Sequence, residues 1–332
     1  MGQELQRRTP ATPVHEGEPS WPTVASNTVH LWLERHHRYR PSRSRRLVLL
    51  LSALVAMALG AGVTLAVTHR GAGHTAPRPG DAAQSPNALQ VAATDRSQAA
   101  RWIAAQVASN IVVSCDPEMC NDLQKSGFPA GQLMELQPSS PDPLGSQLVV
   151  ATPVVRNQFG TRLGTVYAPL VIASFGSGAE RVDVRYVAPD GTAAFEAQLA
   201  TDRKNRISAG QQLLTNERVQ VSASARQALL AGQVDPRLLV TLSALASALV
   251  HVTPIQLIAF DDPSPGVSSD VPLRGAELGA AASAGLPAMV AFLNAQQDQF
   301  APAVARITKT ASGQSVVTVR YDAPGPMGLG GS

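Results

Sequence analysis

Three aspartates occupy positions where the sequence could support acid chemistry. Asp116 directly precedes Pro117, and Asp261 and Asp262 precede Pro263, each after a run rich in apolar, β-forming residues. The carboxyl end of such a strand is where open α/β sheets usually hold ligands, and a carboxylate pair there could share a proton or hold a cation. The simpler interpretation is that these aspartates cap a helix or turn before the prolines. The sequence leaves both interpretations open.

Two arginines lie in a motif that occurs twice. Residues 177–189 have the sequence SGAERVDVRYVAP and residues 312–324 have SGQSVVTVRYDAP, with eight of thirteen positions identical. Within each copy, apolar and polar residues alternate as in a half-buried strand, so Arg185 and Arg320 are expected to project from the exposed face. There they could bind a carboxylate, phosphate or sugar group. The alternative is that they form ion pairs with neighbouring acids.

Cys115 and Cys120 are the only cysteines in the sequence. Their spacing differs from the C-x₂-C spacing of redox and zinc sites. If Asp116 is the N-cap of a following helix, the two cysteines occupy the N′ and N4 positions, which meet in a hydrophobic staple. We therefore expect a structural disulfide that joins a strand to this helix. Buried free thiols and a redox role are the alternatives.

Histidine is too scarce to support several classes of enzyme. After residue 67, the sequence contains only His69, His74 and His251. A zinc site built from histidines cannot be assembled there, and a Ser-His-Asp triad would depend on His251 alone. We expect no metal and no cofactor, whereas catalysis by carboxylates alone stays open.

The repeated motif belongs to a longer parallel between two halves of the sequence. In each half, an apolar helical stretch is followed by a β-rich run that ends in Asp-Pro, and then by the motif. Short buried strands joined by helices are typical of an α/β layer fold. We expect two related α/β lobes at residues 95–191 and 235–326, with a helical connector at 192–234 and a flexible tail at 327–332.

An apolar segment near the amino terminus predicts a transmembrane helix. Residues 47–67 contain no charged residue, and a helix of this length spans roughly 30 Å, the thickness of the hydrocarbon core of a bilayer. The segment is longer than the apolar part of a signal peptide, which favours an uncleaved anchor. Six arginines precede it closely, against two that follow it. The positive-inside rule therefore places the amino terminus in the cytoplasm and the carboxyl-terminal domain outside.

Two segments flank this anchor. Residues 1–46 are expected to be a disordered basic arm, and residues 68–94 a flexible stalk rich in Gly and Pro. Within the arm, residues 29–40 could form an interfacial helix that binds anionic membrane lipid. A plain cluster of stop-transfer charges is the alternative.

The positive charge of the chain is concentrated in the arm. Residues 1–46 hold eight arginines and four glutamates, whereas residues 82–332 hold 17 basic and 19 acidic residues. This distribution argues against a core that binds nucleic acid. In the connector helix, we expect Arg203, Lys204 and Arg206 on the solvated side.

Parts of the sequence resemble known envelope proteins. IVVSCDPEMC at residues 111–120 and LVVATPVVRNQFG at residues 148–160 are similar to the outer α/β domains appended to actinobacterial membrane glycosyltransferases. This resemblance implies an accessory domain in the cell envelope and carries no catalytic motif. VDPRLL at residues 234–239 and SDVPLRGAEL at residues 269–278 resemble stretches of D-Ala-D-Ala carboxypeptidases. Asp270 stands near the place of that family's metal-binding histidine, so the resemblance does not imply zinc.

These observations predict a single-pass membrane protein whose outer part is a binding or assembly module of the cell envelope. Its expected partners are an envelope glycan or another membrane protein. The alternative function is an envelope hydrolase that uses Asp116, Asp261 or Asp262 for carboxylate-based catalysis.

Overall fold

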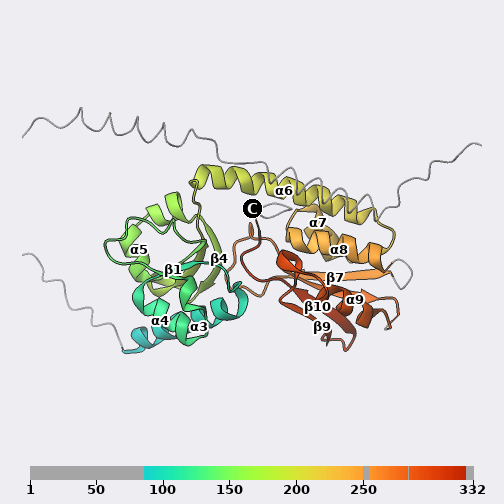
Figure 1. The fold of residues 1–332 in the computed structure, drawn as a ribbon, viewed down its shortest axis with the longest axis horizontal. Helices are drawn as coiled ribbons and strands as arrows, with labels where there is room; N and C mark the ends of the chain where they lie inside the picture. Colours follow the sequence, from blue (N-terminus) through green and yellow to red (C-terminus); the bar gives the residue numbers. More distant parts are fainter. Residues whose placement is uncertain (1–85, 250–253, 283, 327–332) are drawn as a thin grey trace, which may run out of the picture. The chain divides into compact units, whose positions relative to one another are not determined.

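The computed structural model describes residues 86–249, 254–282 and 284–326 (Figure 1). The predicted basic arm, the predicted transmembrane segment, His251 and the tail lie outside these ranges. Among the described residues, no helix is both long and apolar enough to cross a membrane. The described residues belong to one compact unit, and its two five-stranded sheets with surrounding helices confirm the predicted α/β class.

The first sheet has the strand order β2-β1-β3-β5-β4. β1 pairs in parallel with β2 and β3, whereas β5 is antiparallel to both β3 and β4. Five strands form this sheet. They are β1 (Val113–Cys115), β2 (Leu133–Glu135), β3 (Leu148–Ala151), β4 (Leu170–Phe175) and β5 (Val182–Tyr186).

Helices cover both faces of the first sheet. α3 (Pro86–Gln106) and α4 (Pro117–Lys125) share one apolar core with Leu148 and Val150 of β3. α5 (Pro153–Phe159) and the π-helical turn η2 (Leu163–Tyr167) share a second core with Val149 and Ala151. Because strand side chains alternate between faces, successive residues of β3 enter different cores, and all four are buried.

The second sheet has the strand order β6-β7-β8-β10-β9. Only β6 and β7 are parallel, and the other neighbouring pairs are antiparallel. Its strands are β6 (Val219–Val221), β7 (Ile255–Asp261), β8 (Gly275–Ala280), β9 (Val304–Lys309) and β10 (Ser315–Arg320). They share one core with α7 (Ala223–Leu230), α8 (Pro236–Ala248) and α9 (Gly285–Asn294). The long helix α6 (Thr192–Leu214) contacts α7 and α8 (Figure 1).

The two sheets correspond in part. In each, the motif strand (β5 or β10) is fourth in the order, and the strand before it in the chain (β4 or β9) forms the edge after a helix. The first halves differ, because β3 is parallel to β1 whereas β8 is antiparallel to β7. A true duplication of the two lobes therefore stays a prediction.

Two predicted boundaries differ from the structure. α3 begins at Pro86, within the range predicted as a flexible stalk. β6 lies in the range predicted as a connector, but it pairs with β7 and so belongs to the second sheet. The sheet that β6 joins is set by its pairing with β7, a long-range contact that local sequence does not encode.

The chain after β10 joins the two lobes. Ala323 forms a parallel bridge with Val107, which follows α3, through hydrogen bonds with the backbone of Gln106 and Ala108. A second contact covers the edge of β4, where the N–H of Ser174 donates to the carbonyl of Pro265 at 2.7 Å. The bonds of Ala323 fix the end of the second motif against the first lobe, and the bond of Pro265 fixes the segment between β7 and β8 against it.

Candidate functional site

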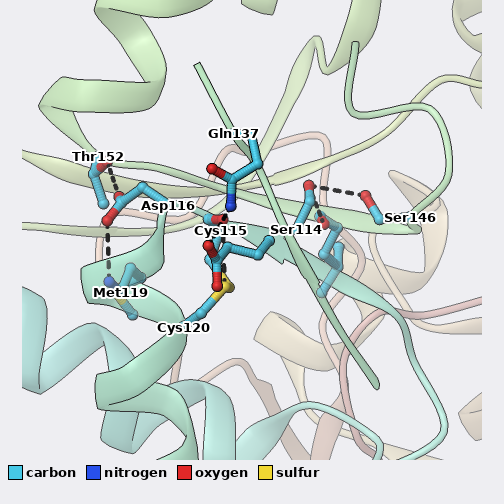
Figure 2. The surroundings of a disulfide bond; sticks show 10 residues. Ser114, Cys115, Asp116, Met119, Cys120, Gln137, Ser146 and Thr152 are labelled. Atoms are coloured by element: carbon cyan, nitrogen blue, oxygen red, sulfur yellow. Dashed lines mark hydrogen bonds between the residues drawn. A yellow bond between two sulfur atoms is a disulfide. The ribbon is translucent and has the colours of Figure 1, made fainter. Parts of the chain in front are cut away.

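The junction of β1 and α4 contains the predicted disulfide (Figure 2). The sulfur atoms of Cys115 and Cys120 lie 1.96 Å apart, and both residues are buried. Asp116 is the N-cap of α4 and Pro117 its first residue, so the cysteines occupy the predicted N′ and N4 positions. The disulfide therefore joins the strand to the helix, and the described part of the chain has no free cysteine.

Both carboxylate oxygens of Asp116 are engaged at the starts of two helices. Oδ1 accepts a hydrogen bond from the N–H of Met119 at 3.0 Å, and Oδ2 accepts one from the hydroxyl of Thr152 at 2.5 Å (Figure 2). Thr152 is itself the N-cap of α5 and accepts from the N–H of Val155. Asp116 is only 5% exposed. Its contacts match the capping interpretation and link helices on opposite faces of the sheet.

The two aspartates of the second lobe lie at the end of β7, where Asp261 is its last residue and Asp262 follows, and they differ in their surroundings. The carboxylate of Asp262 is buried and accepts from Arg274 through Nε at 2.9 Å and Nη2 at 3.1 Å. Asp261 is half exposed and lies 3.6 Å from Nη2 of Arg320. The structure thus places Asp116 beside the first sheet and Asp261 and Asp262 beside the second, each with a different partner. Within the described ranges, no group of three or more His, Cys, Asp or Glu residues could hold a metal ion.

The two motif arginines make contacts within their own lobes. Arg185 donates through Nε to the carbonyl of Ala168 at 2.7 Å and through Nη2 to that of Pro169 at 3.2 Å. The face predicted to be exposed is instead covered by α5 and η2, so the neighbouring Asp183 is only 1% exposed. Arg320 is more accessible and pairs with Asp261. Ligand binding by either arginine stays a prediction.

A cleft of about 850 Å³ brings together the ends of both motif copies. Residues 186–189 line it from the first copy, and Asp322 and Pro324 line it from the second. Further walls come from the chain between α3 and β1, the start of α6, and the turn η4 (Asp298–Phe300). Polar side chains in the lining of the cleft include those of Asn110, Gln147, Asp190, Gln198, Asp298 and Gln299.

One wall of the cleft is a fixed ionic network. Asp235 accepts from Arg237 through Nε at 3.0 Å and Nη2 at 2.8 Å, and both residues are buried. Nη2 also donates to the carbonyl of Asp322 at 2.8 Å, and the guanidinium lies 4.9 Å from the centre of the Tyr321 ring. Because Asp235 neutralises Arg237, this wall presents a positioned donor group and little net positive charge.

Two aromatic rings and three carboxylates complete the cleft. Tyr186 packs against Phe195 with ring centres 5.5 Å apart, and both line the cleft. Asp298 has a φ of +51°, the left-handed region that few non-glycine residues adopt. Burial raises the pKa of Asp322, although Arg237 and Arg274 act to lower it. Asp190 is the third acid and is exposed.

Sequence reasoning found the motif and missed most of the cleft. The signal that could have led to it was the pair of Tyr-x-Ala-Pro endings, because both copies end at the cleft. Gln198, Asp298 and Gln299 lie in no motif and reach the cleft only through the tertiary fold.

No protein-family model, no curated protein and no solved structure matches this chain.

Proposed function

We propose that this protein is a membrane-anchored binding module of the cell envelope, and that its cleft holds a hydroxyl-rich ligand such as a segment of envelope glycan. In this proposal, residues 47–67 form the anchor, the amino terminus is cytoplasmic, and the described domain lies outside the membrane. The composition of the cleft carries the proposal, together with its volume, which falls within the usual range for ligand pockets.

Mixed donors and acceptors in the cleft suit hydroxyl groups. Amides such as Gln198 and Gln299 both donate and accept hydrogen bonds, and the carboxylates of Asp190, Asp298 and Asp322 accept them. A sugar hydroxyl also does both. The ring of Tyr186, which is tilted against that of Phe195, offers an apolar surface with a polar tip, which suits the C–H face of a sugar ring.

The charge balance argues against an anionic ligand in this cleft. Its single cationic side chain, Arg237, is already paired with Asp235, whereas three other carboxylates line the walls. Like charges in a partly dehydrated cleft repel, so a neutral or weakly basic ligand is favoured. The alternative, a hydrolase, would require that carboxylates in this cleft or at the Asp-Pro turns also catalyse hydrolysis of the bound glycan.

The test is calorimetric titration of the full-length chain, in a mild detergent, with soluble fragments of envelope glycan. Replacing two exposed cleft amides in Gln198→Ala with Gln299→Ala should weaken binding by roughly tenfold or more, because two hydrogen bonds are lost. The matched control is Gln211→Ala with Gln227→Ala, two exposed amides that do not line the cleft. Absence of saturable binding, or equal loss in both variants, rejects the proposal. Release of product during the titration would favour the hydrolase.

A further inference from the structure

A second cavity, of about 450 Å³, lies beside α6 and shares no lining residue with the cleft. Three cationic residues of α6 line it: Arg203, Lys204 and Arg206. The sequence predicted all three on the solvated side of the helix, but Arg206 is only 5% exposed. Removing a guanidinium from water is costly unless charges or hydrogen bonds compensate it, so its place in a cavity wall is informative.

One turn of the chain holds two of these cations in place. Nε of Arg203 donates to the carbonyl of Ala231 at 3.1 Å, and Nε of Arg206 donates to that of Gly232 at 2.8 Å. Gly232 has a φ of +66°, and a Cβ there would meet the carbonyl oxygen of Arg203 at 2.8 Å. Glycine therefore allows the turn to lie close enough to α6 to hold both guanidinium groups.

The charges around the cavity favour an anion. Glu196 and Asp270 also line it, but within the described ranges neither lies within ion-pair distance of the three cations. Burial has the largest effect and lowers the pKa of Arg206; the charges of Asp202 and Asp235 raise it, and the nearby Arg203 lowers it by a smaller amount. An arginine remains charged in proteins, so an anion in the cavity would reduce the repulsion between these cations.

We propose that this cavity binds a phosphoryl group. Guanidinium groups held at Nε still offer their terminal N–H donors, whose planar fork matches phosphate oxygens. Lys204 adds a flexible positive charge, and the hydroxyl of Ser269 and the amide of Gln233 add further donors at the lining. The phosphoryl group could belong to a soluble phosphate ester or to a lipid headgroup. The inference is independent of the glycan proposal, because the two sites share no lining residue.

Thermal unfolding of the full-length chain in detergent tests this site with inorganic phosphate, with acetate at matched ionic strength as the reference. Binding to the folded state raises the unfolding temperature in a saturable manner. Lys204 is exposed and makes no hydrogen bond or ion pair with another described residue, so Lys204→Ala should fold normally. We expect this variant to raise the apparent Kd for phosphate by about tenfold or more.

Arg226→Ala is the matched control, since it removes one positive charge from an exposed position on α7 that does not line the cavity. It should keep the wild-type Kd. A phosphate response no larger than that of acetate, or an equal loss in both variants, overturns the proposal.

Two further probes separate the sources of the phosphoryl group: glycerol 3-phosphate, and nanodiscs with or without phosphatidylglycerol. A rise in unfolding temperature with glycerol 3-phosphate that depends on Lys204 identifies a soluble ester. A Lys204-dependent rise in nanodiscs that contain phosphatidylglycerol, relative to nanodiscs without it, identifies a lipid headgroup.

Discussion

Tyr186 and Tyr321 hold equivalent places in the two motif copies but have different roles. Tyr186 lines the cleft and packs on Phe195. Tyr321 is 1% exposed, and its hydroxyl lies 2.7 Å from that of Thr241 and donates to the carbonyl of Phe300 at 3.1 Å. The repeated residue thus lines the cleft in one lobe and is a buried, hydrogen-bonded residue in the other.

Tyr321→Phe should destabilise the protein by about 1–2 kcal/mol at neutral pH, because the hydroxyl of Thr241 and the carbonyl of Phe300 lose a partner. The measurement is urea-induced unfolding of both proteins. The conservative control Tyr186→Phe should have a smaller effect, since the structure gives the Tyr186 hydroxyl no hydrogen bond within the described residues.

Tyr321 should also make the stability of the protein depend on pH in the alkaline range. Burial raises the pKa of Tyr321 from 10.0 to about 12. Between these values the unfolded chain loses the phenolic proton before the folded chain does, so this group's contribution makes stability fall as pH rises. The free energy of unfolding of the wild type should therefore fall more steeply than that of Tyr321→Phe over this interval. Parallel curves would show that the phenol of Tyr321 is not protected by the fold.

Removing the disulfide should lower the free energy of unfolding by about 2 kcal/mol, as the chain-entropy model gives for a loop this short. The measurement is the urea midpoint with and without a reducing agent. Cys115→Ala with Cys120→Ala should match the reduced wild type and show no response to the reducing agent. If the reducing agent also lowered the stability of the double variant, the effect of the reducing agent would not come from this disulfide.

Asp116→Ala should destabilise the protein by about 1–3 kcal/mol, because it removes the cap of α4 and leaves the buried hydroxyl of Thr152 without its acceptor. Unfolding in urea measures the loss. Asn121→Ala, at an exposed position on the same helix, is the control and should change stability by less than about 0.5 kcal/mol. If Asp116→Ala left the free energy of unfolding unchanged, the capping interpretation would be wrong and the catalytic interpretation of this aspartate would be favoured.

Asp322→Asn should alter the pH dependence of stability in acid. The pKa of Asp322 is raised in the folded protein, chiefly by burial, so the folded state holds this proton to higher pH than the unfolded state. Ionisation of Asp322 therefore costs stability, and this cost appears as pH rises above the usual carboxyl range. The variant should lose that component, which chemical unfolding across acidic and neutral pH would measure. Identical profiles for the two proteins would contradict the raised pKa.

Local sequence signals predicted the first lobe well. Asp116-Pro117 set the start of α4, and alternating apolar and polar residues marked β5, because caps and alternation act over a few residues. The sequence did not predict that β6 joins the second sheet. Its pairing with β7 connects residues more than thirty positions apart, which no local pattern records.

The candidate sites were harder to predict because they depend on what covers each face. Alternation in β5 indicated a half-buried strand, but α5 and η2 cover its second face and turn Arg185 into an internal contact. Arg206 was expected in solvent and is instead buried where the turn at Gly232 meets α6. In both cases the sequence correctly predicted the strand or helix that carries the arginine. The burial of its side chain was set by a segment distant in the sequence.

The most direct test of the glycan proposal is photocrosslinking in intact cells. A photoreactive amino acid would replace Gln198 in the cleft, and in a separate control it would replace the exposed Gln227 on α7. If the cleft binds glycan, covalent capture of envelope glycan is expected at position 198 and none above background at position 227. Equal capture at both positions, or none at position 198, would contradict the claim that this cleft binds glycan.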